Sequence, residues 1–172
     1  MITERPPIGN FIEHYMKFVP DGDLIEICVK QMDELYSLIS NLSEDAAEYR
    51  YASEKWSIKE VIGHLTDTER VCAYRLLCAC RGDSTPMPSF DENEYVVQGA
   101  FHKRPILEIL HEWKTVRKAT ISLLRSLTKE SLQNEGTFMN HPNTALVAAC
   151  IIPAHVGHHI NVLHERYGIY FT

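Results

Sequence analysis

Positive charge is scarce in this sequence and is nowhere concentrated. Lysine and arginine supply 17 of the 172 residues against 23 aspartates and glutamates, the formal net charge is −6, and no run of basic residues exceeds two. Nucleic-acid binding needs a basic surface that displaces counterions from the phosphate backbone. The composition therefore argues against a nucleic-acid partner.

Long apolar runs are missing as well. No segment reads as the roughly 20 apolar residues that a membrane-spanning helix needs. The first residues, MITERPPIGNFIEHYMKF, carry charges and prolines where a signal peptide has an apolar stretch. We therefore expect no membrane partner and a cytoplasmic protein. The five cysteines include no CxxC pair, and we expect buried, reduced thiols rather than a disulfide framework.

Strand patterns are weak throughout, whereas four long segments carry apolar residues at the helical period. These segments are residues 23–42, 57–80, 105–127 and 144–167. Ser57 and Glu60 form a capping-box pattern at the start of the second, and Pro153 is expected to kink the fourth. The prediction is an all-α fold, an antiparallel four-helix bundle that forms a single domain over residues 1–172.

Two long links connect the predicted helices. Residues 81–104 contain glycines, prolines and acidic residues, with a short helix expected near residues 91–98, and residues 128–143 form the second link. Links of this length in a compact domain are often functional segments or structured lids. Two large aromatic residues, Trp56 and Tyr74, are expected in the core.

Histidines are concentrated near the C-terminus, where four of the nine lie in PAHVGHHINVLHERYG, residues 153–168. His155 and His159 are four residues apart, so on a helix they share one face with Cβ atoms roughly 5–6 Å apart. Two imidazoles in that arrangement can reach one metal ion. His64 in the second helix is the best candidate for a third ligand. Three imidazoles would leave a position open, which is the arrangement of catalytic metal sites.

Two further residues are candidates for supporting roles at this site. Asp67, three residues after His64, could accept a hydrogen bond from it or serve as a fourth ligand. His158 could replace one of the ligands, donate to a carboxylate or lie at the edge of the site. Histidines at this spacing also occur by chance, so hydrogen-bonded core histidines and a pH-sensitive patch remain alternatives.

The segment YRYASEKWSIKEVIGHLTDTERVCAYR, residues 49–75, resembles the corresponding segment of the DinB-like superfamily, also called DinB/YfiT-like. The likeness continues through FDENEYV (90–96) and the HxxHH run to ERYG (155–168), and it covers most of the chain. Family members often have glycine before and glutamate after the first histidine of that run, where this chain has Ala154 and Val156.

The resemblance implies a four-helix bundle with one divalent metal ion, Zn²⁺ or Ni²⁺, held by His64, His155 and His159. It also implies a metal-dependent enzyme of the thiol (S-)transferase or hydrolase type that acts on a small-molecule substrate, such as a low-molecular-weight thiol. The alternative is a non-catalytic, metal-stabilised bundle that serves as a ligand-binding or interaction module. Relatives often dimerise, so a homodimer is compatible with the sequence.

Four residues would carry the remaining chemistry in the enzyme hypothesis. Asp67 and His158 would orient ligands or move protons, and the simpler alternative for each is an ordinary hydrogen bond. Arg70 and Arg117 could bind an anionic substrate, and the simpler alternative is pairing with acidic side chains at the surface.

Overall fold

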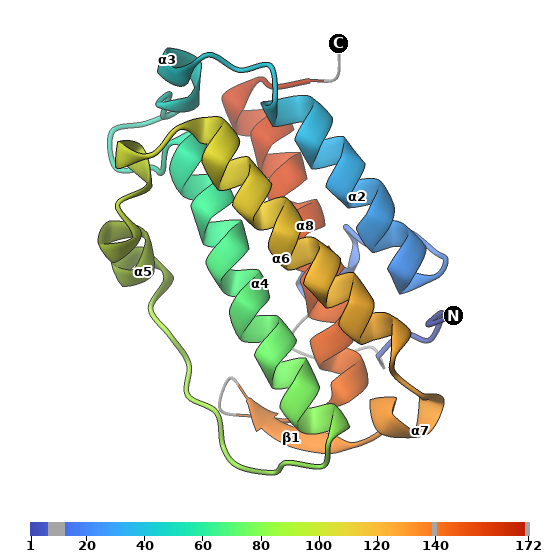
Figure 1. Ribbon diagram of the computed structural model, residues 1–172. Coiled ribbons are helices and arrows are strands. Elements are labelled where there is room, and N and C mark those ends of the chain that lie inside the picture. The colour runs from blue at the N-terminus through green and yellow to red at the C-terminus, as the bar shows by residue number, and fades with distance from the viewer. Residues whose placement is uncertain (7–12, 139–140, 171–172) are drawn as a thin grey trace.

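The computed structural model describes residues 1–6, 13–138 and 141–170. Four long helices form the bundle (Figure 1), and they are α2 (Leu24–Ile39), α4 (Ile58–Cys80), α6 (Ile106–Arg125) and α8 (Ala145–Tyr167). Their ends differ from the predicted ones by at most three residues, and the predicted four-helix bundle is confirmed.

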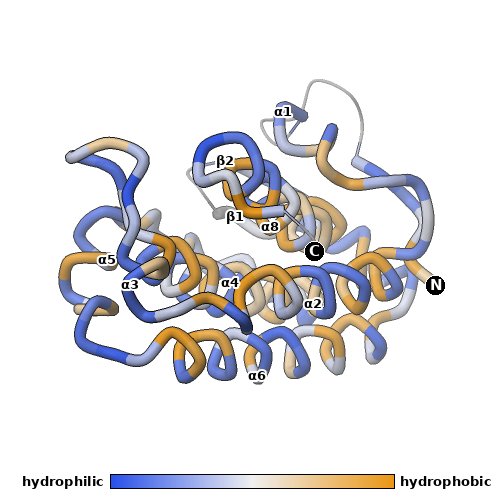
Figure 2. The backbone as a smooth tube through the Cα atoms, turned by 90° about the horizontal axis from the view of Figure 1, so that it is seen from above, coloured by the Kyte–Doolittle hydropathy of each residue, from blue (hydrophilic) through white to orange (hydrophobic). Residues whose placement is uncertain are grey.

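Local sequence signals explain where these helices begin and end. The capping box of α4 is complete, because Ser57 Oγ accepts from the Glu60 amide and Glu60 Oε2 accepts from the Ser57 amide at 2.7 Å. Helix α8 ends at Gly168, whose φ of 67° lies in the left-handed region that favours glycine. Hydrophilic and hydrophobic residues alternate turn by turn along α2 and α6 in Figure 2, the pattern of helices with one buried face.

The order of the helices around the bundle differs from the simple up-and-down arrangement. Helices α4 and α2 each pack against both α6 and α8. The pairs α4/α8 and α2/α6 are antiparallel, but α4 and α6 run in the same direction (Figure 1). The predicted antiparallel arrangement therefore holds for two of the neighbouring pairs, and the pairs α4/α6 and α2/α8 are parallel.

The link after α4 makes this parallel arrangement necessary. It runs from the end of α4 back along the length of the bundle to α5 (Glu92–Gly99) and a 3₁₀ turn, η1 (Phe101–Lys103), before α6 begins (Figure 1). The short helix predicted near residues 91–98 is thus confirmed as α5. The link lies beside α4, and it supplies one wall of the cavity described below.

Smaller elements complete the fold. At the ends of the bundle lie α3 (Glu44–Ala47), α7 (Lys129–Leu132) and an antiparallel hairpin of β1 (Glu135–Phe138) and β2 (His141–Thr144), whereas α1 (Glu13–Met16) packs against the side of α8. The hairpin was not predicted, because each strand has four residues and β2 contains Pro142, which a strand pattern disfavours. The Met87 amide donates to the Thr137 carbonyl at 2.9 Å, which ties the long link to this hairpin.

The apolar core consists of two clusters, one toward each end of the bundle. One cluster contains Leu24, Leu76 and Ala149, and the other contains Leu65, Trp113 and Ile160. A buried polar layer lies between them, formed by Gln31, Glu69 and Arg117 from three different helices.

Helix α8 is the most apolar of the four helices of the bundle. By length and composition alone it is apolar enough to cross a membrane, contrary to the expectation from the sequence, but 61% of its apolar window is buried inside the bundle. It continues through Pro153, and Gln31 Nε2 donates to the Pro153 carbonyl at 2.8 Å. The burial of α8 identifies it as a core helix of this fold.

Candidate metal centre

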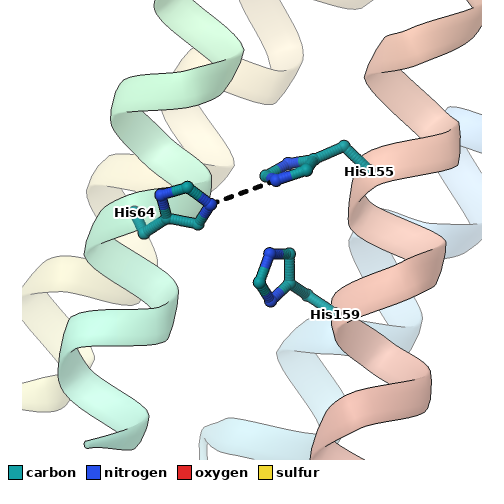
Figure 3. Close-up of side chains that lie close together, drawn as sticks. All are labelled: His64, His155 and His159. Carbon is teal, nitrogen blue, oxygen red and sulfur yellow. Dashed lines mark hydrogen bonds between the residues drawn. The ribbon is translucent and has the colours of Figure 1, made fainter. Parts of the chain in front are cut away.

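The two antiparallel helices α4 and α8 bring the three predicted histidines together. His64 lies in the second turn of α4, and His155 and His159 lie one turn apart on the face of α8 that packs against α4. Figure 3 shows the three rings pointing toward one another across the space between the helices. The spatial convergence that the sequence predicted is therefore present in the fold.

The distances between the rings are those of a shared site. The Nε2 atoms of His64 and His155 are 3.0 Å apart (Figure 3), and the three ring centroids are separated by 4.6 to 5.0 Å. One nitrogen of each ring can be chosen so that all three lie within 4.8 Å of one another. Nitrogen atoms bound to one Zn²⁺ at about 2.0–2.1 Å lie at most about 4.2 Å apart. A separation of up to 4.8 Å is longer than this limit, so the rings must turn toward one another before all three nitrogens can bind one ion.

Burial keeps these imidazoles in the neutral form that binds metal. It lowers the pKa of His64 to about 4 and lowers the pKa values of His155 and His159 well below their usual value. The neighbouring histidines lower the pKa values of His155 and His159 further, because two adjacent imidazoles resist being charged together. At neutral pH each ring thus presents an unprotonated nitrogen, and the buried Nδ1 of His159 has no hydrogen-bond partner among the described residues.

Thr68 is a site residue that the sequence analysis missed. Its hydroxyl lies 3.4 Å from Nδ1 of His64, one helical turn along α4. A hydroxyl oxygen that accepts from Nδ1–H leaves the Nε2 lone pair free, and Nε2 is the atom that faces His155. The spacing of four residues from His64 was the signal that could have identified Thr68.

Asp67 does not take the place predicted for it. Its carboxylate pairs with Arg70 at 3.4 Å, it makes no hydrogen bond with His64 in the described part of the chain, and it does not line the cavity. Burial raises the pKa of Asp67 despite the adjacent Arg70 guanidinium. The correction is geometric, because at this point of α4 the side chain three residues after His64 is directed toward Arg70.

The two arginines predicted to bind substrate are both engaged elsewhere. Arg70 is half-exposed and pairs with Glu112 at 2.7 Å as well as with Asp67. Arg117 is fully buried in the polar layer, where Nε and Nη2 donate to Glu69 Oε2 and Nη1 donates to Gln31. Neither side chain lines the histidine cavity. Pairing with acids, the simpler alternative, accounts for both, although the partner of Arg117 lies in the interior and not at the surface.

His158 lies beside the three histidines without joining them. Its ring packs edge-on against Tyr15 and Phe18, and its buried Nδ1 has no hydrogen-bond partner among the described residues. Burial lowers the pKa of His158, which is therefore neutral near pH 7. Of the roles left open by the sequence, the structure supports a position at the edge of the site.

A cavity of about 350 Å³ opens onto the histidines between α4, α8 and the 81–91 link. Trp56 lies in its wall with its ring 4.6 Å from that of His64, and it is half-buried and packs against the core cluster that contains Leu65, so the predicted core position is confirmed in part. Tyr74, also predicted in the core, is 60% exposed. A second cavity of about 280 Å³ shares Trp56, His158 and His159 with the first.

Comparison with known proteins identifies a family for this architecture. The family model described as the DinB superfamily matches residues 29–163. This range includes α4 and most of α8, and with them all three histidines.

Two proteins of Oceanobacillus iheyensis are similar in sequence. One, named "Putative metal-dependent hydrolase OB0782", is 26% identical over 86% of this chain and 84% of its own length. The other, named "Putative metal-dependent hydrolase OB0413", is 21% identical over 74% of each chain.

The fold also has a counterpart among solved structures. YfiT from Bacillus subtilis, described as a probable metal-dependent hydrolase with an unusual four-helix bundle topology, superposes with a TM-score of 0.76. The match covers 97% of this chain and 95% of YfiT at 17% sequence identity. At that identity the likeness concerns the fold.

Proposed function

This chain belongs to the DinB superfamily, and on that premise we propose that it is a metal-dependent enzyme of the hydrolase type. His64, His155 and His159 are the proposed ligands of one divalent cation, and the cavity in front of them is the proposed substrate site. The observation that carries the proposal is the convergence of three neutral imidazoles, from two helices, on one cavity. The names of the two Oceanobacillus relatives support the same class of reaction.

The donor set fits a divalent transition metal. Three imidazole nitrogens suit Zn²⁺ and Ni²⁺ alike, so either metal remains a prediction. When bound, the cation supplies Lewis acidity, which polarises a carbonyl oxygen and lowers the pKa of water.

The residues around the histidines have separable tasks in this proposal. Thr68 orients the ring of His64. Trp56 and Phe90 line the cavity with aromatic surface that excludes water from the reacting atoms. The ring of His158 lines the cavity at the edge of the site, where it could hold or move a proton. No carboxylate follows His155 in sequence, since the next residue is the buried Val156.

A thiol transferase is the second candidate, and the second cavity favours it. A transferase must hold two substrates at one reacting centre, and the two cavities meet at Trp56, His158 and His159. A low-molecular-weight thiol in one cavity and an electrophilic acceptor in the other would satisfy this requirement.

Metal analysis of protein purified without a histidine tag tests the site. The wild type and a His164→Ala control are expected to hold close to one ion per chain, and His155→Ala is expected to hold none. His164 is a suitable control because it lies on the same helix but stacks against Tyr170, away from the other three histidines. A wild-type protein that fails to bind Zn²⁺ or Ni²⁺ would contradict the proposal.

Turnover then separates the candidate functions. We expect the metal-loaded wild type to hydrolyse members of an ester and amide panel, and the metal-free protein and His155→Ala not to do so. Activity confined to a panel of thiols with electrophilic acceptors would favour the transferase. A metal-loaded protein that is inactive on both panels would favour the non-catalytic, metal-stabilised module.

Predictions about partners and location follow from the composition. The net charge of −6 supports the absence of a nucleic-acid partner, and the burial of α8 supports the absence of a membrane partner. A cytoplasmic location and a homodimer stay predictions, which cell fractionation and light scattering respectively would test.

A further inference from the structure

A second buried arginine, Arg75, lies in the wall of the histidine cavity. Cavity-lining residues of α4 occur at His64, Thr68, Cys72 and Arg75, so they form a stripe along one face of the helix. The eleven residue-to-residue steps from His64 to Arg75 correspond to about 16 Å along the helix axis. Arg75 therefore occupies the end of this stripe that is farthest from the histidines.

The charge of Arg75 has no counter-ion among the residues that the structure describes. Arg75 and Arg117 are the two buried arginines of the described chain, with 4% and 0% of their surface exposed. Arg117 is paired with Glu69, whereas no carboxylate among the described residues lies within 4.0 Å of the Arg75 guanidinium. A buried charge without a partner is costly, so an unpaired guanidinium at a cavity wall indicates a site for an anion.

The long link holds this guanidinium in place. Arg75 Nη2 donates to the Pro88 carbonyl at 2.7 Å, and the guanidinium carbon lies 6.0 Å from the centre of the Phe90 ring. One nitrogen is thus committed to the link, and Nε and Nη1 make no hydrogen bond with the described residues. The side chain is oriented by the fold and retains donors for a ligand.

The wall between the two ends of the cavity is largely apolar. Ile151 and Phe90 line it, together with Cys72, whose thiol stays protonated because burial raises its pKa to about 11. A volume of about 350 Å³, distributed along about 16 Å of helix, describes a slot rather than a round chamber. Such a slot fits an extended molecule with an apolar middle.

Apart from the histidine cluster, Arg75 and Glu92 are the charged residues of the described cavity lining. Glu92 is the one carboxylate in the described lining, and it is exposed and unpaired with Arg75. The interior of the slot is therefore positive at one end, and its rim carries a negative charge.

We propose that Arg75 forms a carboxylate-binding subsite, so that the substrate is an elongated molecule with a carboxylate at one end and its reacting group at the histidines. An apolar spacer would cross the slot between the two ends. A planar carboxylate matches the forked geometry of a guanidinium. This inference rests on the proposed function for the identity of the reacting end, but the subsite itself is testable without metal or turnover.

Calorimetry on metal-free protein, with hexanoate and the neutral hexanamide as probes, tests the subsite directly. Wild type is expected to prefer hexanoate, and Arg75→Gln is expected to bind hexanoate at least about tenfold more weakly, because a hydrogen bond to a charged group is lost. Arg70→Gln is the matched control, since Arg70 lies on the same helix but pairs with Glu112 outside the cavity. It is expected to bind hexanoate as the wild type does.

Equal binding of hexanoate and hexanamide by the wild type, or undiminished hexanoate binding by a folded Arg75→Gln protein, would overturn the subsite. If Arg75→Gln does not fold, Glu92→Gln decides the question. Removal of the rim carboxylate should tighten hexanoate binding several-fold at low ionic strength, and unchanged binding would overturn the proposal.

Metal stoichiometry, measured on the same preparations before the metal is removed for calorimetry, separates the two proposals. Protein that binds hexanoate through Arg75 but holds no metal would retain the subsite and contradict the metal-dependent enzyme. Protein that holds metal but shows no preference for hexanoate would retain the metal site and contradict the subsite at Arg75.

Discussion

The hydroxyl of Thr68 is placed where it can determine which nitrogen of His64, one of the proposed metal ligands, faces the site. It is the polar group found beside Nδ1 of His64, at 3.4 Å. Without an acceptor at that position, the tautomer of His64 with its proton on Nδ1 is no longer favoured, and the imidazole ring of His64 can rotate away from His155. Groups that orient metal-binding histidines in this way typically change metal affinity by about 10- to 100-fold when they are removed.

Thr68→Val is accordingly expected to weaken metal binding by about tenfold or more, measured by competition with a chromophoric chelator. The substitution keeps the shape of the side chain and removes only the hydroxyl. Thr66→Val is the matched control, because the Thr66 hydroxyl donates to the Ile62 carbonyl of its own helix at 2.9 Å and contacts no ligand. Equal losses of affinity in both variants would show that the hydroxyl of Thr68 does not orient His64.

At the residue scale the sequence predicted the histidines better than their surroundings. His155 and His159 are identified by a spacing within one helix, His64 is the best candidate for a third ligand in another helix, and the resemblance to a family implies the same three residues. The residues around them were misassigned because their roles depend on other elements. Arg117 could not be distinguished from a substrate-binding arginine until α6 placed it against Glu69 of α4, and nothing local in the sequence distinguishes Arg75.

At the scale of elements, the close approach of η1 to α4 depends on two glycines. The Phe101 ring is buried between Gly63 of α4 and Gly99 of α5, and a Cβ atom at either glycine would overlap that ring. The sequence pattern does not predict this contact, because Phe101 lies in the long link. The contact fixes the segment that leads into α6. It does so at Gly63, the residue that precedes His64.

Gly63→Ala is therefore expected to destabilise the protein despite the better helix propensity of alanine. Overpacking costs about 1–3 kcal/mol, and the propensity gain offsets about 1 kcal/mol of it. Urea unfolding of the metal-free protein measures the difference. Phe101→Leu in the Gly63→Ala background should relieve the overlap, so the free energies of the two single changes should not add. Strict additivity would show that the ring and the glycine are not coupled.

Helix boundaries were predictable because they depend on local chemistry, whereas helix directions were not. The capping box at Ser57 and the glycine after Tyr167 act within one turn of the chain. The direction of α6 depends on whether the link before it crosses one end of the bundle or returns along it. An extended chain covers about 3.3–3.6 Å per residue, so the eleven residues 81–91 can span at most about 36–40 Å. That is enough to cover the length of α4, which rises about 1.5 Å for each of its 23 residues.

At the scale of the whole molecule, the polar layer and the histidine site lie next to each other along the bundle. Gln31 joins Arg117 of the layer to the carbonyl of Pro153, two residues before His155. A metal ion bound between α4 and α8 would hold these two helices together. The polar layer also connects α4 to α8, through Arg117 of α6 and Gln31 of α2. The ion would therefore stabilise the entire bundle by binding the folded state alone.

The stability of the metal-free protein should consequently depend on pH through His64, His155 and His159. In the unfolded chain each histidine has a pKa near 6.5, and in the folded protein burial holds each pKa far lower. Below about pH 6.5 the unfolded state thus binds more protons than the folded state. The free energy of unfolding should fall by up to about 1.4 kcal/mol per pH unit for each histidine between pH 6.5 and 4, and these groups should contribute no slope above that range.

Urea unfolding in the presence of a chelator at pH 7.5, 6.5 and 5.5 measures this dependence. A variant with glutamine at all three positions, His64→Gln/His155→Gln/His159→Gln, is expected to show a much shallower pH dependence, and equal slopes in the two proteins would contradict the assignment. Added Zn²⁺ should stabilise the wild type at pH 7.5, and protonation of the ligands should remove that stabilisation as the pH falls. Because the three buried histidines carry both effects, loss of the fold and loss of metal should occur over the same range of pH.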